Sequence, residues 1–262
     1  MTEKTTLVIG QGEIGTPIAK ILENKYKTST KDLADIQNPG PVSVLHICYP
    51  FQIQNFIDVS LEYIEIYSPD LTIIHSTVIP GTTDLLSSKT NSPIIYSPVR
   101  GKHSTMETEL LSLRKYMAST DTKALNFAKK YMEDTGFTIE LFTTPSSLEL
   151  AKILETSYFG LLIGWAQEME RYTKSVDGNY EEIMKFALED DISYMPKVIF
   201  QPGFIGGHCV MPNIELLETL KKSSFLDAIK ESNSLKQKEW IETGKNLDQR
   251  LGPSPLENPT AE

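Results

Sequence analysis

The sequence predicts an α/β fold, in which a Rossmann-like doubly wound parallel sheet is followed by a mainly helical domain with a long connecting helix. In the first half of the chain, short β-rich runs alternate with helical segments through short connections, a pattern typical of parallel sheets. Residues 146–174 instead lack proline and carry apolar side chains three or four positions apart, which predicts one long helix. We therefore expect a Rossmann-like domain over residues 1–145, a helical domain over 146–250 and a disordered tail over 251–262.

Each expected element rests on a local pattern. Strands are expected where β-branched and apolar residues run together, at 6–9, 26–31, 42–48, 71–75 and 93–96, and also near 115–118 and 137–140. Helices are expected from Pro17 onward and over 53–66, 82–88 and 123–134. At the start of the long helix, Ser146 and Glu149 are spaced as in a capping box, with Ser146 as the expected cap.

Composition and charge exclude several classes of protein. The chain has 262 residues and a formal net charge of −10, which argues against a nucleic-acid partner because such partners favour basic patches. No apolar run reaches the length of a membrane-spanning helix, and the N-terminal residues lead directly into a strand without a signal peptide. Cys48 and Cys209 cannot make a disulfide framework and the four histidines are dispersed, so we expect a cytoplasmic protein without a metal site or a membrane partner.

The segment Gly10-Gln11-Gly12-Glu13-Ile14-Gly15 has the GxGxxG pattern between an expected strand and an expected helix. In this setting the backbone approaches a pyrophosphate at the positive end of the helix dipole, although FAD and S-adenosylmethionine fit the motif as well. Asp32 lies about 20 residues further on, where an acidic residue holds a ribose hydroxyl. Its alternative role is to cap a helix that begins at Leu33. The neighbouring Lys31 leaves NADP open as the cofactor in place of NAD.

Polar residues also follow other strands of the expected sheet. Ser76 and Thr77 come at the carboxyl end of a strand, where ligands bind in such sheets, so we assign both to the cofactor site. The alternative is a simple turn in which Thr82 or Thr83 caps the next helix. We assign the same role to all six residues of the glycine loop, to Asp32, and to the pair Tyr49 and Pro50.

A glycine-rich loop carries the second cysteine. It reads Gln201-Pro202-Gly203-Phe204-Ile205-Gly206-Gly207-His208-Cys209, and glycine leaves room for a substrate to approach the thiol. A nearby cation would favour the nucleophilic thiolate. The alternative is that Cys209 is a buried, inert side chain. Lys152, early in the long helix, could stabilise an oxyanion, although most helical lysines are solvated surface residues.

Four segments occur together in an order that is known from one family. They are the Gly10–Gly15 loop, Ser76-Thr77-Val78 with Pro80-Gly81-Thr82, Glu149-Leu150-Ala151-Lys152 with Glu155, Trp165 and Glu168, and the loop from Gly203 to Cys209. Over roughly residues 5–215 the chain thereby resembles the UDP-glucose/GDP-mannose dehydrogenase family. Members of that family oxidise C6 of a nucleotide sugar twice with NAD, from alcohol to acid, through a cysteine thiohemiacetal and thioester.

The resemblance implies a role for several residues. Cys209 is the implied nucleophile, Lys152 stabilises the oxyanion, and Thr77 orders a water or the nicotinamide. Asn213 stands where the family has Asp, and we count it among the catalytic candidates. The 146–174 helix is the implied core of a homodimer, and NAD is the implied cofactor.

The chain also departs from the family pattern. Val99 follows Pro98 where the family has the glutamate implicated in thioester hydrolysis, and Thr156 replaces an Asn. Only about fifty residues follow Cys209, so we expect the family's third, nucleotide-sugar-binding domain to be missing. The sequence therefore predicts an NAD(P)-dependent oxidoreductase acting on a hydroxyl or aldehyde of a small, sugar-derived or carboxylated substrate, without the full four-electron oxidation.

Two other functions remain open at this level. One is a two-electron 3-hydroxyacid dehydrogenase, in which Arg100, Lys102 and His103 would hold a carboxylate and Cys209 would be a packing residue. The other is a non-redox protein, either an S-adenosylmethionine-dependent methyltransferase or a nucleotide-binding module that has lost its chemistry. The ligand distinguishes them, because a dehydrogenase must bind NAD or NADP.

Overall fold

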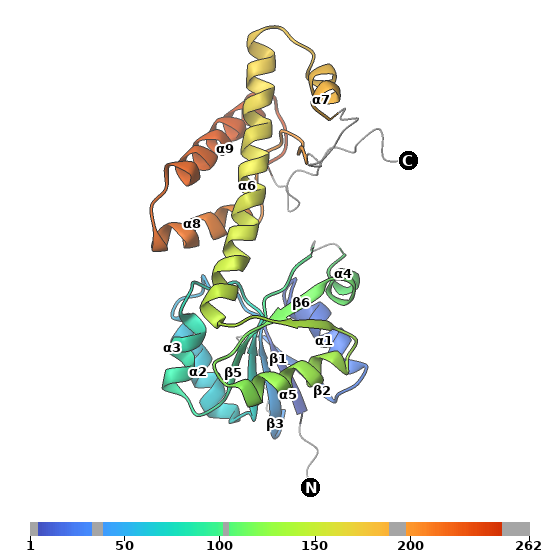
Figure 1. The fold of residues 1–262 in the computed structure, drawn as a ribbon, viewed down its shortest axis with the longest axis vertical. Helices are drawn as coiled ribbons and strands as arrows, with labels where there is room; N and C mark the ends of the chain where they lie inside the picture. The colour runs from blue at the N-terminus through green and yellow to red at the C-terminus, as the bar shows by residue number, and fades with distance from the viewer. Residues whose placement is uncertain (1–4, 33–38, 102–104, 189–197, 248–262) are drawn as a thin grey trace. The chain divides into compact units, whose positions relative to one another are not determined.

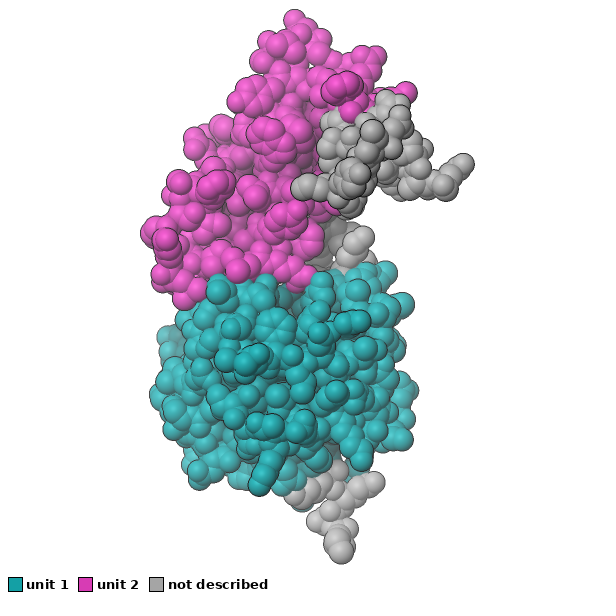
Figure 2. Space-filling model, viewed as in Figure 1, with its two compact units in different colours: residues 1–152 teal, residues 153–262 magenta. Residues whose placement is uncertain are grey.

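The computed structural model describes residues 5–32, 39–101, 105–188 and 198–247. The chain divides into two compact units, residues 1–152 and 153–262, which are coloured separately in Figure 2. The first unit holds the strands and the second unit is helical (Figure 1).

The core of unit 1 is a five-stranded parallel sheet in the order β2-β1-β3-β4-β5. Its strands are β1 (Thr5–Ile9), β2 (Thr28–Lys31), β3 (Val42–Ile47), β4 (Leu71–Ile74) and β5 (Ile94–Tyr96). Strands β6 (Arg114–Met117) and β7 (Thr138–Leu141) form a second parallel pair, which the Tyr96–Ala118 bridge connects to β5. The order reverses direction at β1, so the prediction of a doubly wound sheet is confirmed.

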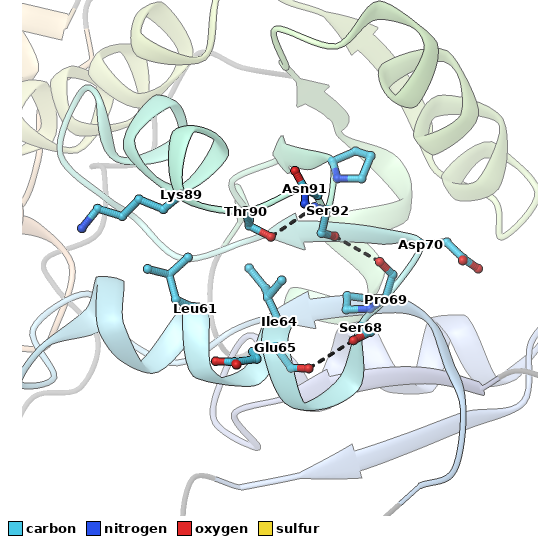
Figure 3. Close-up of a pocket in the computed structure, with 11 residues that line it drawn as sticks. Leu61, Ile64, Glu65, Ser68, Pro69, Asp70, Lys89, Thr90, Asn91 and Ser92 are labelled. Carbon is cyan, nitrogen blue, oxygen red and sulfur yellow. Dashed lines mark hydrogen bonds between the residues drawn. The ribbon is translucent and has the colours of Figure 1, made fainter.

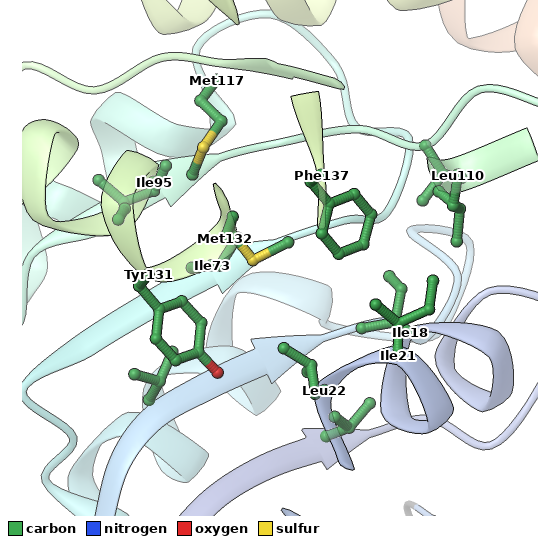
Figure 4. Close-up of a cluster of buried hydrophobic side chains, with 14 of the residues drawn as sticks. Ile18, Ile21, Leu22, Ile73, Ile95, Leu110, Met117, Tyr131, Met132 and Phe137 are labelled. Carbon is green, nitrogen blue, oxygen red and sulfur yellow. The ribbon is translucent and has the colours of Figure 1, made fainter. Parts of the chain in front are cut away.

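Helices cover both faces of this sheet, and the strands β1, β3, β4 and β5 are accordingly buried along almost their whole length, whereas the edge strand β2 is polar. On one face lie α1 (Gly15–Glu23), α4 (Met106–Ser112) and α5 (Thr122–Glu133), whose apolar side chains share a core cluster with the sheet (Figure 4). On the other face lie α2 (Phe56–Tyr67) and α3 (Thr82–Lys89). The sequence analysis did not predict α4, whose seven residues contribute only Met106 and Leu110 to the buried set.

Unit 2 is built along α6 (Pro145–Ser175), the expected long helix, whose first residues through Lys152 belong to unit 1. The others are α7 (Tyr180–Leu188), α8 (Val210–Leu220) and α9 (Ser224–Glu242). Apolar side chains of α6, α8 and α9 pack into one cluster that includes Ile163, Ile214 and Ile229. Within the described ranges, every helix is too short or too polar to cross a lipid bilayer.

The predicted capping box at the start of α6 is wrong. Helix α6 begins at Pro145, so Ser146 lies inside its first turn and donates a hydrogen bond to Asp84. The Thr144 hydroxyl accepts a hydrogen bond from the Ser147 backbone amide at 3.3 Å and takes the capping position. Proline fits directly after this cap, since its missing N–H needs no partner there.

Glu149 caps a different helix. Its buried carboxylate accepts hydrogen bonds from the Gly81 amide at 2.7 Å, the Thr83 amide at 2.8 Å and the Thr83 hydroxyl at 2.6 Å. These donors lie at the start of α3, where backbone amides lack partners within the helix. The cap of α3 therefore comes from α6, and neither Thr82 nor Thr83 occupies the N-cap position, which is Gly81.

Candidate functional site

The loops that leave the carboxyl ends of the parallel strands meet at one edge of the sheet. They begin at Gly10 after β1, Asp32 after β2, Cys48 after β3, His75 after β4 and Ser97 after β5. Ligands of doubly wound sheets bind at this edge, beside the point where the strand order reverses. The structure therefore brings the glycine loop and the predicted residues after the neighbouring strands to one place.

The three glycines of the loop have different surroundings. A Cβ on Gly15 would lie 1.7 Å from the Gly10 carbonyl oxygen, and a Cβ on Gly10 would lie 2.7 Å from the Tyr49 nitrogen. Gly10 also has a φ of +97°, which only glycine adopts readily. A Cβ on Gly12 would meet no protein atom within 4 Å. The fold thus requires the first and third glycines, whereas the second faces open space.

The remaining loop residues lead into the start of α1. Gln11 and Ile14 are half-buried and Glu13 is exposed, and the Gln11 carbonyl accepts a hydrogen bond from the Thr16 hydroxyl at 2.9 Å. The loop therefore ends at a helix N-terminus, which is a general binding site for a phosphate group. Among the described residues, no cluster of three or more His, Cys, Asp or Glu side chains could hold a metal ion.

Asp32 lies next to the glycine loop. The Gly10 amide donates a hydrogen bond to the Lys31 carbonyl at 2.9 Å, so the residue after Lys31 emerges beside the turn. The Asp32 side chain is exposed. Its alternative role as a helix cap depends on Leu33, which lies outside the described residues.

The predicted residues after β3 and β4 differ in how far they are buried. The Tyr49 hydroxyl is buried against Ser60 at 2.7 Å, and the Tyr49 carbonyl accepts a hydrogen bond from the Ser76 hydroxyl at 2.5 Å. These two residues connect the loops after β3 and β4 to each other. Pro50 is exposed and Thr77 is half-buried, so both remain accessible at the edge.

A buried chain of polar groups crosses unit 1, although the sequence analysis treated the histidines as dispersed. His75 Nδ1 lies 2.8 Å from the Ser97 carbonyl, and His75 Nε2 lies 2.9 Å from His46 Nδ1. His46 Nε2 lies 3.1 Å from the Tyr131 hydroxyl. Because the Ser97 carbonyl can only accept, His75 carries a proton on Nδ1. With both rings neutral, His75 Nε2 accepts from His46, which then carries its own proton on Nδ1. Burial lowers the pKa of His46 to about 3 and places that of His75 well below its usual value.

A buried lysine lies at the same edge, and the sequence analysis placed it only within a strand. Lys115 on β6 donates hydrogen bonds from Nζ to the Ser97 carbonyl at 2.8 Å and the Pro98 carbonyl at 3.1 Å. Burial lowers the pKa of Lys115 to about 7; the Cys48 thiol acts in the opposite direction and the Lys152 ammonium in the same one. Burial also raises the pKa of Cys48 to about 12, so this thiol stays protonated and unreactive.

The residues after β5 provide no carboxylate at the position where the resembled family has glutamate. Val99 is buried in the core cluster shared with α1, α4 and α5. The Arg100 guanidinium lies over the Tyr116 ring at 5.8 Å. Lys102 and His103, the other members of the predicted carboxylate-binding trio, lie outside the described residues.

In unit 2, Cys209 is half-buried and immediately precedes α8. Asn213, one turn further on, is buried and donates a hydrogen bond from Nδ2 to the Thr156 hydroxyl of α6 at 2.9 Å. Two positions at which the chain departs from the family pattern therefore contact each other. His208 is exposed beside the cysteine.

A separate hollow of about 800 Å³ lies at the opposite edge of the sheet (Figure 3). Its lining includes Asp70 and Pro93, which precede β4 and β5, and the ends of α2 and α3. This hollow is therefore remote from the glycine loop and takes no part in the site described above.

The fold and the loops at the carboxyl edge define a Rossmann-like unit joined to a helical unit. Residues 146–234 match the central domain of the UDP-glucose/GDP-mannose dehydrogenase family, which confirms the predicted resemblance to that family. The UDP-N-acetyl-D-mannosamine dehydrogenase of Methanocaldococcus jannaschii is 25% identical over 260 residues, covering 79% of this chain and 60% of the relative. The chain is thus shorter than this relative and spans less than two thirds of its length.

Solved structures share the fold at low sequence identity. The UDP-D-ManNAc dehydrogenase of Pyrococcus horikoshii matches 92% of this chain and 70% of its own, with a TM-score of 0.74 and 18% identity. The 3-hydroxyisobutyrate dehydrogenase of Mycobacterium tuberculosis matches 92% of this chain and 95% of its own, with a TM-score of 0.67 and 12% identity. These relatives are dehydrogenases, which does not favour a methyltransferase or a binding module without redox chemistry.

Proposed function

We propose that the chain is an NAD-dependent dehydrogenase that oxidises a hydroxyl or aldehyde group of a small, sugar-derived or carboxylated substrate. The observation that carries this proposal is the open space at Gly12, beside the start of α1 and the exposed Asp32. A dinucleotide fits this arrangement, with the pyrophosphate at the helix N-terminus and a ribose hydroxyl on the carboxylate. NADP is the alternative cofactor, although the side chain of Lys31, which precedes Asp32, is buried with its Nζ 5.6 Å from the centroid of the Tyr63 ring.

Four side chains of the chain would take part in the reaction: Thr77, Lys152, Cys209 and Asn213. When bound, the dinucleotide supplies the hydride acceptor. Thr77, accessible at the edge after β4, would order a water or the nicotinamide. The Lys152 ammonium would stabilise the developing alkoxide or oxyanion. Cys209 would attack an aldehyde carbon to form a thiohemiacetal, with Asn213 one turn away in α8.

The missing carboxylate limits how far such a reaction proceeds. Hydrolysis of a thioester needs an activated water, and Val99 is buried in the apolar core at the family's glutamate position. Asn213 cannot act as a base in place of Asp, and its amide is engaged with Thr156. We therefore propose a single two-electron oxidation rather than the four-electron oxidation of the family. An aldehyde held as the thiohemiacetal would lose hydride to the dinucleotide and become the Cys209 thioester, which water would hydrolyse slowly, without a carboxylate base, to release the acid and the thiol.

Ligand-dependent thermal unfolding tests the cofactor. NAD, NADH, NADP, NADPH and S-adenosylmethionine are each added at about 100 times the dissociation constant, which stabilises a binding protein by about 2.7 kcal/mol. We expect a rise of several degrees with NAD or NADP and none with S-adenosylmethionine. Stabilisation by S-adenosylmethionine alone would contradict the proposal.

Cys209→Ser tests the nucleophile. If the thiol forms a covalent adduct, aldehyde oxidation should be abolished while the stabilisation by NAD stays unchanged. Unchanged turnover would remove Cys209 from the chemistry and favour the second candidate, a 3-hydroxyacid dehydrogenase. That candidate is supported by the similar architecture of the mycobacterial 3-hydroxyisobutyrate dehydrogenase, of which 95% is matched. Turnover of a 3-hydroxyacid by the Cys209→Ser variant would establish it.

We further propose a homodimer through α6. Large apolar side chains are exposed along one stripe of this helix, at steps of four and three residues: Leu154, Tyr158, Leu161 and Trp165, followed by Tyr172. Such a stripe is the pattern of a helix that packs against another helix. Action in a reducing compartment such as the cytoplasm is consistent with Cys48 and Cys209, neither of which is in a disulfide.

A further inference from the structure

The loop that leads to Cys209 is held by two buried amide side chains. Asn233 of α9 accepts a hydrogen bond from the Ile205 amide at 2.8 Å and donates one to the Ile205 carbonyl at 3.0 Å. Gln167 of α6 donates to the Gly203 carbonyl at 2.7 Å and to Asn233 Oδ1 at 3.3 Å. Both amides are buried, so water does not compete for these bonds. We call Gln167 and Asn233 the loop clamp.

Backbone groups determine the orientation of both amides of the loop clamp. The Gly203 carbonyl can only accept, so Gln167 must turn its NH2 group toward Gly203. The Ile205 amide can only donate and the Ile205 carbonyl can only accept, so Asn233 must turn Oδ1 toward the first and its NH2 group toward the second. Gln167 Oε1 then faces the Ser232 hydroxyl at 2.8 Å.

The clamp and a second contact lie on opposite sides of the cysteine. Ile205 is four residues before Cys209, and Asn213, which binds Thr156 of α6, is four residues after it. Between Ile205 and Cys209 lie Gly206 and Gly207, whose backbones would otherwise be the least restricted in the loop. Asn233 of α9 holds one end of this nine-residue segment and Thr156 of α6 holds the other, and the thiol lies midway between them.

We propose that Gln167 and Asn233 are positioning residues for Cys209, holding the thiol at the start of α8, where the helix dipole favours a thiolate. The proposal rests on the proposed function in so far as Cys209 is the nucleophile. Asn233 contributes one donor and one acceptor to a single loop residue, as a neighbouring strand does in a sheet. Loss of the Asn233 donor or acceptor should free the backbone of the cysteine loop at Ile205. It would not remove any group that touches the substrate.

Asn233→Asp is the informative variant, because it preserves shape and volume. An ionised aspartate still accepts from Ile205 and Gln167 but cannot donate to the Ile205 carbonyl. Ser234→Ala, at the exposed neighbouring position, is the matched control. The probe is iodoacetamide, with alkylation of Cys209 followed by mass spectrometry from pH 6 to 9, and the buried Cys48 serves as an internal marker of unfolding.

For Asn233→Asp we expect alkylation of Cys209 at pH 7 to slow by about tenfold, the size of effect expected for one buried hydrogen bond. The pH midpoint of the reaction should move upward, while Cys48 stays unreactive and Ser234→Ala behaves as wild type. Hydrogen exchange of the peptide around Ile205 should accelerate without a change in α6. An alkylation rate and pH profile equal to wild type, in a folded Asn233→Asp protein, would overturn the inference.

Steady-state kinetics adds a readout that a purely structural role would not change. A positioning role predicts a lower kcat for aldehyde oxidation with an unchanged KM for NAD. Alkylation and hydrogen exchange need no turnover, so they test the clamp even if the chain proves not to be a dehydrogenase. Conversely, wild-type alkylation in Asn233→Asp together with full activity defeats the clamp and leaves the proposed function in place.

Discussion

Gly12→Ala distinguishes the effect of a side chain at this position on folding from its effect on dinucleotide binding. The added Cβ would meet no protein atom within 4 Å, and Gly12 is not among the glycines with a positive φ. Replacing glycine by alanine at such a position stabilises a protein by about 0.4–1 kcal/mol, because it lowers the conformational entropy of the unfolded chain. The unfolding midpoint of the ligand-free variant should therefore stay constant or rise by a few degrees, at ~2–4 °C per kcal/mol.

The same methyl group should oppose cofactor binding. If the pyrophosphate lies against Gly12, the overlap costs about 1–3 kcal/mol. At ~1.4 kcal/mol per tenfold, that is a loss of roughly 5- to 150-fold in affinity for NAD. Isothermal titration calorimetry measures this loss directly. Glu23→Ala, at the exposed end of α1, should retain wild-type affinity.

Equal affinities of wild type and Gly12→Ala would refute the reasoning, because the open space would then not be where the phosphates lie. Gly15→Ala provides the converse case. Its Cβ would lie 1.7 Å from the Gly10 carbonyl oxygen, so the ligand-free protein itself should lose about 3 kcal/mol or more of unfolding free energy.

Three further changes test other parts of the structure. Glu149→Gln places an amide donor against the donors of Gly81 and Thr83. Urea unfolding should show a loss of about 2–3 kcal/mol in the free energy of unfolding. An unchanged midpoint would show that α3 needs no cap from α6. Burial lowers the pKa of Lys115 to about 7 in the folded protein, against roughly 10.4 in the unfolded chain. Between these values the unfolded chain binds more protons than the folded protein, so the free energy of unfolding should rise from pH 7 to 9, by up to about 1.4 kcal/mol per pH unit. Lys115→Met should flatten this slope, and a slope that persists in the variant would assign it to another group. Trp165→Glu in the exposed stripe of α6 should convert a dimer to monomers in sedimentation velocity; a wild-type protein that is already monomeric would contradict the proposed dimer.

Most helices and strands could be predicted from the sequence, because the patterns that indicate them lie within short segments of the chain. The glycine loop between a β-rich run and Pro17 defined the first strand and helix, and alternation of such segments defined a parallel sheet. Helix α4 was missed because only Met106 and Leu110 are buried in it, too few for a periodic pattern. The cap of α6 was assigned to Ser146 rather than Thr144 because the capping-box spacing also fits a glutamate that serves another helix.

The candidate site was less accessible to sequence reasoning, because its parts depend on contacts between distant segments. His46 and His75 are 29 residues apart, yet His46 Nδ1 and His75 Nε2 lie 2.9 Å apart because the two residues sit at the ends of adjacent parallel strands. Lys115 appeared as an ordinary residue of a strand, although its side chain is buried against the loop after β5. Likewise, no spacing rule connects Gln167 and Asn233 to the cysteine loop, since two different helices supply them.

The hydrogen bond between Thr156 and Asn213 couples two positions at which this chain departs from the resembled family. The Thr156 hydroxyl donates to the Ile153 carbonyl at 2.9 Å and accepts from Asn213 Nδ2 at 2.9 Å. An ionised Asp at position 213 has no proton to donate, so the Thr156 hydroxyl would have to turn its own proton from the Ile153 carbonyl to the carboxylate. An amide at position 156 could donate to that carboxylate directly. The free-energy cost of Asn213→Asp therefore depends on whether Thr156→Asn is present, so the two substitutions are not additive.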